Sequence, residues 1–257
     1  MPEESADKPL RADSQFVDRV IPSPNFGERR QENPPEMAVL HYTGMKNAEV
    51  ALRRLCCRDA EVSSHYLIRE NGEIIQLVAE DQRAWHAGNA CWRGIKDINS
   101  RSIGIEIVNR GHEHGYVEFP DVQMESVVRL LGDVVARNRI KPENILAHSD
   151  IAPLRKQDPG ELFDWHSLHK AGLGIWVKPA PVRPGNQLEM GQEGDGVLSY
   201  QLALKKLGFE IEANGKFDQL TFACTTAFQR HFRQEKVDGI ADKSTIDTLN
   251  KLLETDY

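Results

Sequence analysis

Three residues, two histidines and one aspartate, have types and settings suited to binding a metal ion. His41 ends the apolar run 37–40, and His148 follows the apolar run 145–147. Two histidines at strand ends converge on one point where their strands are neighbours, and Asp158 lies in a proline-flanked loop that can fold back toward them. Taken singly, a histidine in such a setting is more often a packed or surface residue, so the hypothesis depends on all three meeting.

Two imidazoles and one carboxylate form a three-ligand zinc set. Such a set leaves the fourth tetrahedral position open for water, whereas structural zinc sites usually have four protein ligands. Bound zinc lowers the pKa of that water to about 7 and polarises a carbonyl group. Hydrolysis of an amide needs both effects, so the set predicts a zinc hydrolase with one zinc ion per chain.

Glu106 is the charged residue in the isoleucine-rich run 102–108. Strand alternation places the isoleucines on one face, toward a core, and Glu106 with Gly104 on the other. A charge within an apolar strand is costly unless it is paired or lies in a cleft, and Gly104 leaves open space beside the carboxylate. We interpret Glu106 as a general base that takes a proton from the attacking water. The alternative is a salt-bridged or solvated glutamate on an exposed sheet face.

Lys156 lies two residues before Asp158, so a metal ligand at Asp158 would bring the lysine ammonium group close to the metal. A positive charge there stabilises the oxyanion that develops as water attacks the carbonyl. The alternative is a surface lysine, which is the usual setting of this residue type.

The segments that must position these residues alternate between strand and helix patterns. Runs 64–69 and 73–78 flank Asn71-Gly72, a strong signal for a hairpin turn. The run 102–108 is typical of a central strand. Over 121–138 the apolar residues recur at three- and four-residue steps, which predicts an amphipathic helix with Asp121 at its N-cap.

Strands and helices mixed within one segment indicate an α/β domain, a mixed central β-sheet flanked by helices, over about 36–178. A short helix over 164–173 is expected to end it. Residues 1–35 form a polar leader in this interpretation, and the proline-rich segment 179–191 forms a linker. Over 192–257 the apolar spacing predicts a small three-helix domain. Its helices are expected over 197–207, 221–232 and 244–253.

Composition excludes several classes of partner. The formal charge of −7 provides no basic excess to displace phosphate counterions, so we expect no nucleic-acid partner. The chain has no apolar run near the roughly 20 residues that span a bilayer, and its first 30 residues lack the apolar region of a signal peptide. Its four cysteines show no CxxC spacing and are interpreted as free thiols, which suit a reducing compartment.

Five sequence segments, considered together, resemble a known family. They are His41-Tyr42-Thr43, Ser64-His65-Tyr66, Ala84-Trp85-His86-Ala87-Gly88, Ser102-Ile103-Gly104-Ile105-Glu106, and His148-Ser149-Asp150-Ile151-Ala152-Pro153 with Lys156-Gln157-Asp158-Pro159-Gly160. In this order they closely resemble the zinc-dependent N-acetylmuramoyl-L-alanine amidases of the peptidoglycan-recognition superfamily. These enzymes cut the bond between the muramoyl lactyl group and L-alanine.

The resemblance implies a role for each matching residue. His41, His148 and Asp158 match the zinc ligands of the family. Glu106 matches the catalytic base, and Lys156 matches the lysine that supports the oxyanion. The segment with Trp85 and His86 matches one that lines the substrate groove, so His86 is expected to contact substrate. Trp85 is expected either to stack on a sugar or to pack against the protein. His65 is expected to be structural. Cys91 has no base beside it in sequence, so we do not interpret it as a nucleophile.

The C-terminal segment resembles the small three-helix peptidoglycan-binding domain over about 195–254. The matching features are a leucine-glycine turn at 207–208, Asn214-Gly215, Asp238-Gly239 and a phenylalanine-glutamine helix at 228–229. Where the family usually has a glycine after the phenylalanine, this chain has Asp218. The phenylalanines are also explained by a small hydrophobic core, so a degenerate module that only packs beside the groove is an alternative.

Two functions are consistent with these sequence features. The first is an amidase acting on peptidoglycan or on (anhydro)muropeptides. The alternative is a non-catalytic muropeptide-recognition protein that keeps the groove without the metal, and members of that kind typically lack a zinc ligand. Free thiols favour small anhydromuropeptides in the cytoplasm. The C-terminal module favours muropeptides or whole sacculus in the periplasm or cell envelope, and the full layout resembles bacterial amidases that accept both.

Overall fold

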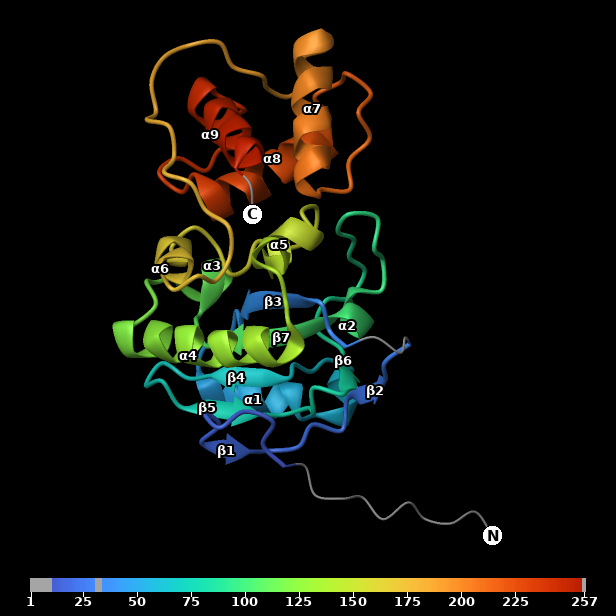
Figure 1. Cartoon of the computed structure of the whole chain (residues 1–257), viewed down its shortest axis with the longest axis vertical. Coiled ribbons are helices and arrows are strands. Elements are labelled where there is room, and N and C mark those ends of the chain that lie inside the picture. Colours follow the sequence, from blue (N-terminus) through green and yellow to red (C-terminus); the bar gives the residue numbers. More distant parts are fainter. Residues whose placement is uncertain (1–10, 31–33, 256–257) are drawn as a thin grey trace.

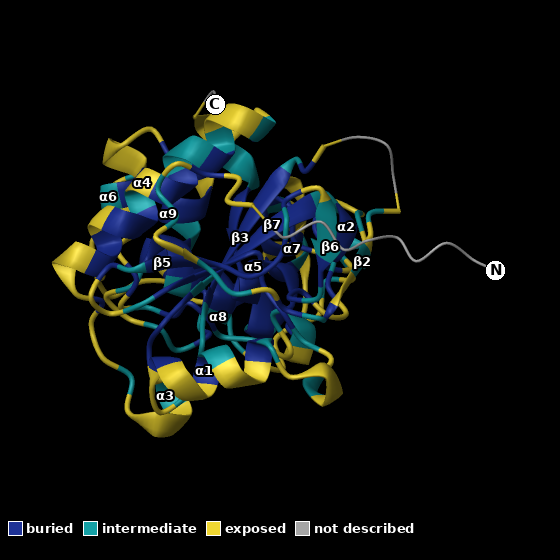
Figure 2. Ribbon diagram, turned by 90° about the horizontal axis from the view of Figure 1, so that it is seen from below, coloured by how far each residue is buried: buried dark blue, intermediate teal, exposed yellow. Residues whose placement is uncertain are grey.

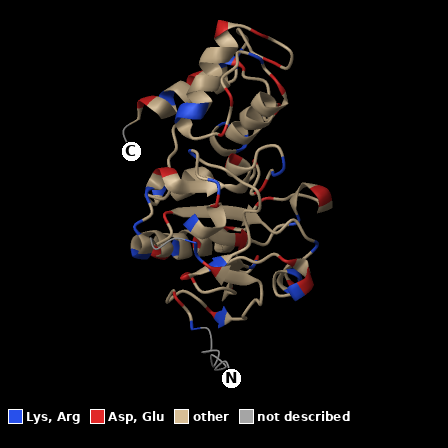
Figure 3. Ribbon diagram, turned by 90° about the vertical axis from the view of Figure 1, so that its right-hand side faces the viewer, with Lys and Arg blue, Asp and Glu red and all other residues tan. Residues whose placement is uncertain are grey.

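The structure is a computed structural model and describes residues 11–30 and 34–255. A sheet domain and a smaller helical domain lie against one another (Figure 1). Acidic and basic residues are interspersed along both domains (Figure 3). Among the described residues, no helix has the length and apolar character needed to cross a membrane.

The main sheet is mixed, as the sequence predicts, with its strands in the order β1-β5-β4-β7-β3-β8. The pairs β1·β5, β4·β7, β7·β3 and β3·β8 are parallel, and β4·β5 is antiparallel. Strands β2 and β6 form a separate antiparallel pair. The strands are β1 (Arg19–Val20), β2 (Phe26–Glu28), β3 (Met37–Tyr42), β4 (Tyr66–Ile68), β5 (Ile74–Gln76), β6 (Gln82–Ala84), β7 (Ser102–Ile107) and β8 (Ile145–Ala147).

The hairpin and the central strand are confirmed. Strands β4 and β5 pair across Asn71-Gly72, and Gly72 has a φ of +85°, a backbone conformation that favours glycine. Strand β7 lies inside the sheet between β4 and β3, and its register pairs Glu106 with His41. Residues opposite each other on neighbouring strands point to the same face, so the register brings the predicted base beside a predicted ligand.

The helices of the sheet domain are α1 (Ala48–Leu55), α2 (Ile98–Arg101), α3 (Gly111–His114), α4 (Asp121–Asn138), α5 (His148–Ile151) and α6 (Trp165–Lys170). Helix α4 has the predicted bounds, but the N-cap prediction is wrong. Pro120 precedes the helix at that position, and Asp121 is its first residue, where an acidic side chain suits the helix dipole.

The two faces of β7 have different roles. Its isoleucines pack with Val127, Leu130 and other apolar residues of α4 in one buried cluster. The opposite face carries Ser102, Gly104 and Glu106. Glu106 lines the candidate pocket, and Ser102 and Gly104 lie against the His86 ring. Figure 2 shows the central strands β3 and β7 buried, with more exposed helices around them.

The polar leader predicted for residues 1–35 is wrong for the part that the structure describes. Strand β1 extends the main sheet beside β5, and β2 pairs with β6. Arg29, which follows β2, donates to the backbone carbonyls of Glu80, Ser100 and Ser102. These strands are too short for a periodic pattern to reveal them. Residues 1–10 and 31–33 lie outside the described part.

The helical domain contains α7 (Asp195–Leu207), α8 (Gln219–Phe232) and α9 (Lys243–Glu254), close to the predicted ranges. Asp218 stands where the family pattern has glycine, and its carboxylate caps α8 by accepting from Thr221 N at 2.8 Å. The proline-rich segment packs against this domain, because Ala180 N donates to Thr248 Oγ1 and Leu188 pairs with Ala241.

Candidate active site

His41, His148 and Asp158 meet at one point. His41 Nδ1 lies 2.9 Å from His148 Nδ1 and 3.1 Å from Asp158 Oδ2, and His148 Nδ1 lies 3.0 Å from the same oxygen. All three residues are buried. Strands β3 and β8 are paired, so the end of β3 and the start of α5 place the two imidazoles side by side. Contrary to the expected strand end, His148 is the first residue of α5.

The three donor atoms fit a zinc ion. In tetrahedral zinc sites the metal lies about 2.0–2.1 Å from each ligand nitrogen or oxygen, which puts ligand atoms about 3.3 Å apart. The three contacts of 2.9–3.1 Å need little adjustment to match this. Burial, and then the neighbouring His148, lower the pKa of His41 to about 4, so its imidazole is neutral at pH 7, the form that binds metal.

Asp158 supplies negative charge to this cluster. Burial alone would raise its pKa, but His148 and His41 together hold the pKa of its carboxyl well below the usual range. The carboxylate is therefore ionised across the physiological range. Two imidazole nitrogens and one carboxylate oxygen form the set expected of a catalytic zinc site.

Behind His41 a chain of hydrogen bonds runs through His86. His41 Nε2 lies 3.0 Å from His86 Nδ1, and His86 Nε2 lies 3.1 Å from Ser102 Oγ. Ser102 Oγ donates to Ile98 O at 2.6 Å, so each group in the chain donates to the next when His41 is protonated at Nε2. This leaves His41 Nδ1 unprotonated and available to a metal.

His86 was predicted to contact substrate. Both of its ring nitrogens face protein groups, so the structure places it behind His41, although its ring also lines the pocket. Gly104 makes room for it, since a Cβ at residue 104 would overlap His86 Cγ. The space expected beside Glu106 is therefore filled by the His86 ring.

His148 is oriented in a similar way by Ala87, the residue that follows His86. Its Nε2 lies 3.2 Å from Ala87 O, an acceptor that fixes the proton on Nε2 and leaves Nδ1 for a metal. Arg155 Nη2 donates to the same carbonyl at 2.8 Å and to Asn89 O at 2.9 Å. A backbone carbonyl carries no side-chain signal, so sequence reasoning missed this contact.

Glu106 faces the pocket with one free oxygen. Its Oε2 is enclosed and has no hydrogen-bond partner among the described residues. Burial raises the pKa of this carboxyl well above its usual range, and the charge of Asp158 adds to the rise, whereas Lys156 opposes it. A carboxyl group with a raised pKa and an unpartnered oxygen is suited to accepting a proton.

A pocket of about 310 Å³ joins these residues to the surface. Lys156 and Trp85 line it, together with the three predicted ligands and Glu106. The structure thus brings every predicted site residue to one pocket. His65 is buried elsewhere in the sheet, where its Nδ1 accepts from Gly104 N at 2.9 Å, which fits the structural role expected of it.

His112 also lines this pocket, although no role was predicted for it from the sequence. Its Nδ1 lies 3.0 Å from Tyr42 Oη, and its Nε2 lies 3.1 Å from Glu161 Oε1. These two partners hold the ring at the pocket wall, and Glu161 follows Asp158 closely in the chain. Its surroundings are polar and local periodicity is lacking, so the sequence offered no signal for this placement.

Comparison with known families decides the identity of the chain. Residues 31–161 match a family model described as N-acetylmuramoyl-L-alanine amidase, which is more than half of the chain. The chain belongs to the N-acetylmuramoyl-L-alanine amidase family. Within the family, it is 37% identical over 231 residues to the amidase AmiD of Escherichia coli K12, covering 85% of this chain and 82% of AmiD. Residues 193–249 match a peptidoglycan binding domain model.

Other members of the amidase family are similar over shorter or longer stretches. The 1,6-anhydro-N-acetylmuramyl-L-alanine amidase AmpD of Enterobacter cloacae is 32% identical over 168 residues, covering 59% of this chain and 88% of AmpD. A solved complex of E. coli AmiD with anhydro-N-acetylmuramic acid-L-Ala-D-γ-Glu-L-Lys has a TM-score of 0.73 and 34% identity, covering 90% of this chain and 97% of that one. AmpDh3 of Pseudomonas aeruginosa with an anhydromuramic pentapeptide has a TM-score of 0.70 and 26% identity, covering 99% and 98%.

Proposed function

We propose that this amidase hydrolyses the bond between the muramoyl lactyl group and L-alanine at a zinc ion held by His41, His148 and Asp158. The observation that carries the proposal is the convergence of these three side chains at the floor of the pocket that Glu106 and Lys156 line. Family membership supports the reaction class, and the geometry of the pocket supports the assignment of the residues.

Each residue has a role that follows from its surroundings. Zinc bound there would polarise the scissile carbonyl and activate a water molecule for attack. Glu106 accepts a proton from the attacking water through its free Oε2 and returns it to the leaving amine. The ammonium group of Lys156 stabilises negative charge on the carbonyl oxygen. Trp85, half-buried at the pocket wall, offers an aromatic face to a sugar ring.

The rival function is a recognition protein without catalysis. Such a protein has no need of a general base, and burying a glutamate without a hydrogen-bond partner costs stability. Glu106 has that cost, and all three ligand positions are occupied by metal-binding residue types. Both features favour the enzyme over the recognition protein.

The proposed substrates are muropeptides, including those with an anhydro sugar. This rests on the solved relatives, since AmiD and AmpDh3 each have a solved complex with an anhydromuropeptide. Polymeric peptidoglycan is a second proposed substrate, favoured by the match of residues 193–249 to a peptidoglycan binding domain.

The proposed compartment is the cytoplasm. All four cysteines are free, and Cys57 is exposed, which suits a reducing environment. Labelling of the cysteines in intact cells with a membrane-impermeant thiol reagent tests this. Protection of Cys57 in intact cells but not in lysates supports the cytoplasm, and labelling in intact cells would favour the envelope.

The test of the function is a cleavage assay with mass spectrometry. The protein should release free peptide from N-acetylmuramoyl-peptides, and chelation should abolish release. Glu106→Gln should lower turnover by about 10²–10⁴ while zinc remains bound, because general acid–base catalysis contributes that much. Glu125→Gln, an exposed change on α4, is the matched control and should keep full activity. Full turnover by Glu106→Gln would refute the assignment of the base.

A further inference from the structure

The segment 148–165 carries two of the three proposed zinc ligands and Lys156, and it lies against the helical domain. The end of α8 contacts it, and Figure 1 shows α5 between the sheet and the upper helices. The ligand segment is mostly loop, with only the single turn α5 and the start of α6 in regular structure. It therefore depends on contacts from outside for its shape.

A buried hydrogen bond joins the two domains at this point. His231 Nδ1, on α8, lies 2.8 Å from Asp150 Oδ2, on α5, and both side chains are almost completely buried. The carboxylate can only accept, so His231 donates from Nδ1. The His231 ring is stacked on Trp165, with ring centroids 3.7 Å apart and an angle of 23° between the planes. These contacts allow the ring little freedom.

Asp150 passes this restraint to the ligands. Asp150 Oδ2, which accepts from His231, also accepts from Ala147 N at 2.8 Å. Ala147 directly precedes His148. Ser149 N donates to Asp158 O at 3.0 Å, which ties the two ligand positions together through the backbone. A shift of Asp150 therefore moves the start of α5, where His148 lies, and the partner segment at Asp158.

Two neighbours of His231 contact the rest of the segment. Arg230 Nη2 donates to Gln157 Oε1 at 3.2 Å, and Arg230 Nε forms an ion pair with Glu161 at 3.4 Å. Gln234 Nε2 donates to Phe163 O at 2.7 Å. The end of α8 thus contacts the ligand segment on both sides of Asp158.

We propose that His231, together with Arg230, is a positioning residue for the zinc site, so that the helical domain is part of the catalytic architecture. This inference rests on the proposed zinc site. The residues act through Asp150 and Gln157, one residue or more away from the ligands, and touch neither substrate nor metal.

The test is the zinc dissociation constant of the full chain, measured by competition with a chromophoric chelator. His231→Phe keeps an aromatic ring for the stack on Trp165 but removes the donor to Asp150. We expect its zinc dissociation constant to rise about 10- to 100-fold, as for other groups that orient metal ligands. His231→Asn restores a donor near the position of Nδ1 and should recover most of the affinity.

Cys224→Ala is the matched control. Cys224 lies two turns earlier on α8, buried in the apolar cluster, so its loss weakens the packing there. Among the described residues it forms no hydrogen bond or ion pair with the ligand segment. Its zinc affinity should equal that of the wild type. Equal losses in Cys224→Ala and His231→Phe would overturn the proposal, because they would indicate general destabilisation.

Wild-type zinc affinity in a folded His231→Phe would also overturn it. Should that variant not fold, Arg230→Met becomes the test, since it removes the contacts to Gln157 and Glu161 from a half-buried position. A raised dissociation constant supports the proposal, and an unchanged one overturns it. A wild-type protein that takes up no zinc would instead refute the proposed function.

Discussion

The two histidines direct the same nitrogen toward the proposed metal position because different groups of one segment lie behind them. His86 accepts from His41 Nε2, and Ala87 O accepts from His148 Nε2. Consecutive residues thus select the tautomer of both imidazoles. The sequence motif around Trp85 indicated a role for His86, but only the fold shows that its ring contacts His41.

Replacing His86 tests this arrangement. We expect His86→Ala to raise the zinc dissociation constant about 10- to 100-fold, because His41 loses the acceptor that fixes its tautomer. Chelator competition measures the constant. His169→Ala, at an exposed histidine on α6 that does not line the pocket, is the control. Unchanged zinc affinity in His86→Ala would show that the ring serves substrate contact instead.

Glu106 makes the zinc-free protein less stable at neutral pH. Its pKa is raised in the folded state by burial, so folding favours the protonated form. Below the unfolded pKa of about 4.3, Glu106 is protonated in both the folded and the unfolded protein, so it does not lower stability. As the pH rises above this value, the carboxyl ionises in the unfolded protein, which lowers the free energy of that state. Glu106→Gln should therefore unfold at higher urea concentration than the wild type at pH 7.5.

Urea unfolding of chelator-treated protein at several pH values measures this difference. The gain in free energy of unfolding should shrink toward zero as the pH falls to about 4. A variant less stable than the wild type at pH 7.5 would mean that the carboxylate is compensated in the folded state, contrary to its unpartnered Oε2.

At the scale of elements, periodicity determined which predictions succeed. The apolar pattern of helix α4 continues over 18 residues, and the sequence predicted both ends of the helix. Asn71-Gly72 indicated the hairpin. Helix α1 was not predicted, although Asn47 caps it by accepting from Val50 N and provided a signal. The helical start at His148 depends on Asp150 accepting from Ala147 N, a contact that no spacing rule singles out.

At residue 104 of strand β7, only glycine leaves enough space for the His86 ring. A Cβ there would overlap the His86 ring, so Gly104→Ala should destabilise the protein by about 1–3 kcal/mol and weaken zinc binding. Gly132→Ala on α4 is the control, since no atom outside the adjacent backbone of α4 lies within 4 Å of its Cβ position. That change should stabilise the helix by about 0.5–1 kcal/mol. Equal stability of the two variants would contradict the packing described for His86.

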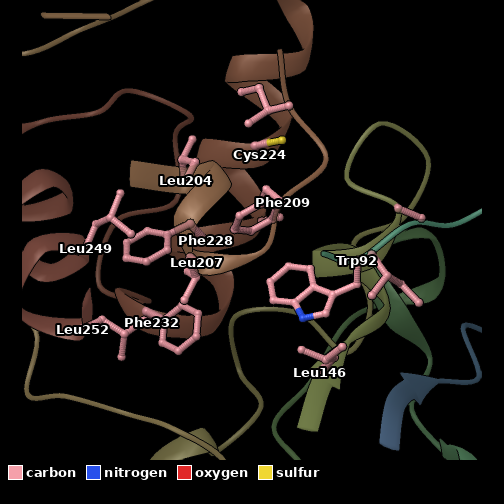
Figure 4. Packing of buried hydrophobic residues seen from close by; sticks show 14 of the residues in the cluster. Trp92, Leu146, Leu204, Leu207, Phe209, Cys224, Phe228, Phe232, Leu249 and Leu252 are labelled. Carbon is pink, nitrogen blue, oxygen red and sulfur yellow. The ribbon is translucent and has the colours of Figure 1, made fainter. Parts of the chain in front are cut away.

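At the scale of the whole molecule, one apolar cluster spans both domains. Trp92 and Leu146 of the sheet domain pack against Leu207, Phe209 and Phe232 of the helical domain (Figure 4). Trp92 meets Phe209 edge to face, with ring centroids 5.3 Å apart. Such an interface favours cooperative unfolding of both domains.

Trp92→Ala should separate the unfolding of the domains. The loss of a buried tryptophan costs about 3–5 kcal/mol and should convert one calorimetric transition into two. Leu202→Ala is the control, because Leu202 on α7 is exposed. A single transition at the wild-type temperature in Trp92→Ala would show that the domains are stabilised independently of this contact.

The sequence predicted two domains but not their mutual packing. Apolar residues such as Trp92 and Phe209 were visible, but their spacing assigns them only to local elements. His231 is one of nine histidines, and nothing around it in the sequence indicates Asp150 as its partner. Contacts between distant segments depend on the tertiary arrangement, which single-sequence patterns do not encode.

The most direct test of the account is X-ray diffraction from crystals of the purified protein at the zinc absorption edge. The account predicts one anomalous peak per chain, about 2.0–2.2 Å from His41 Nδ1, His148 Nδ1 and an oxygen of Asp158. No peak after incubation with zinc, or a peak that lacks any of these three ligands, would contradict it.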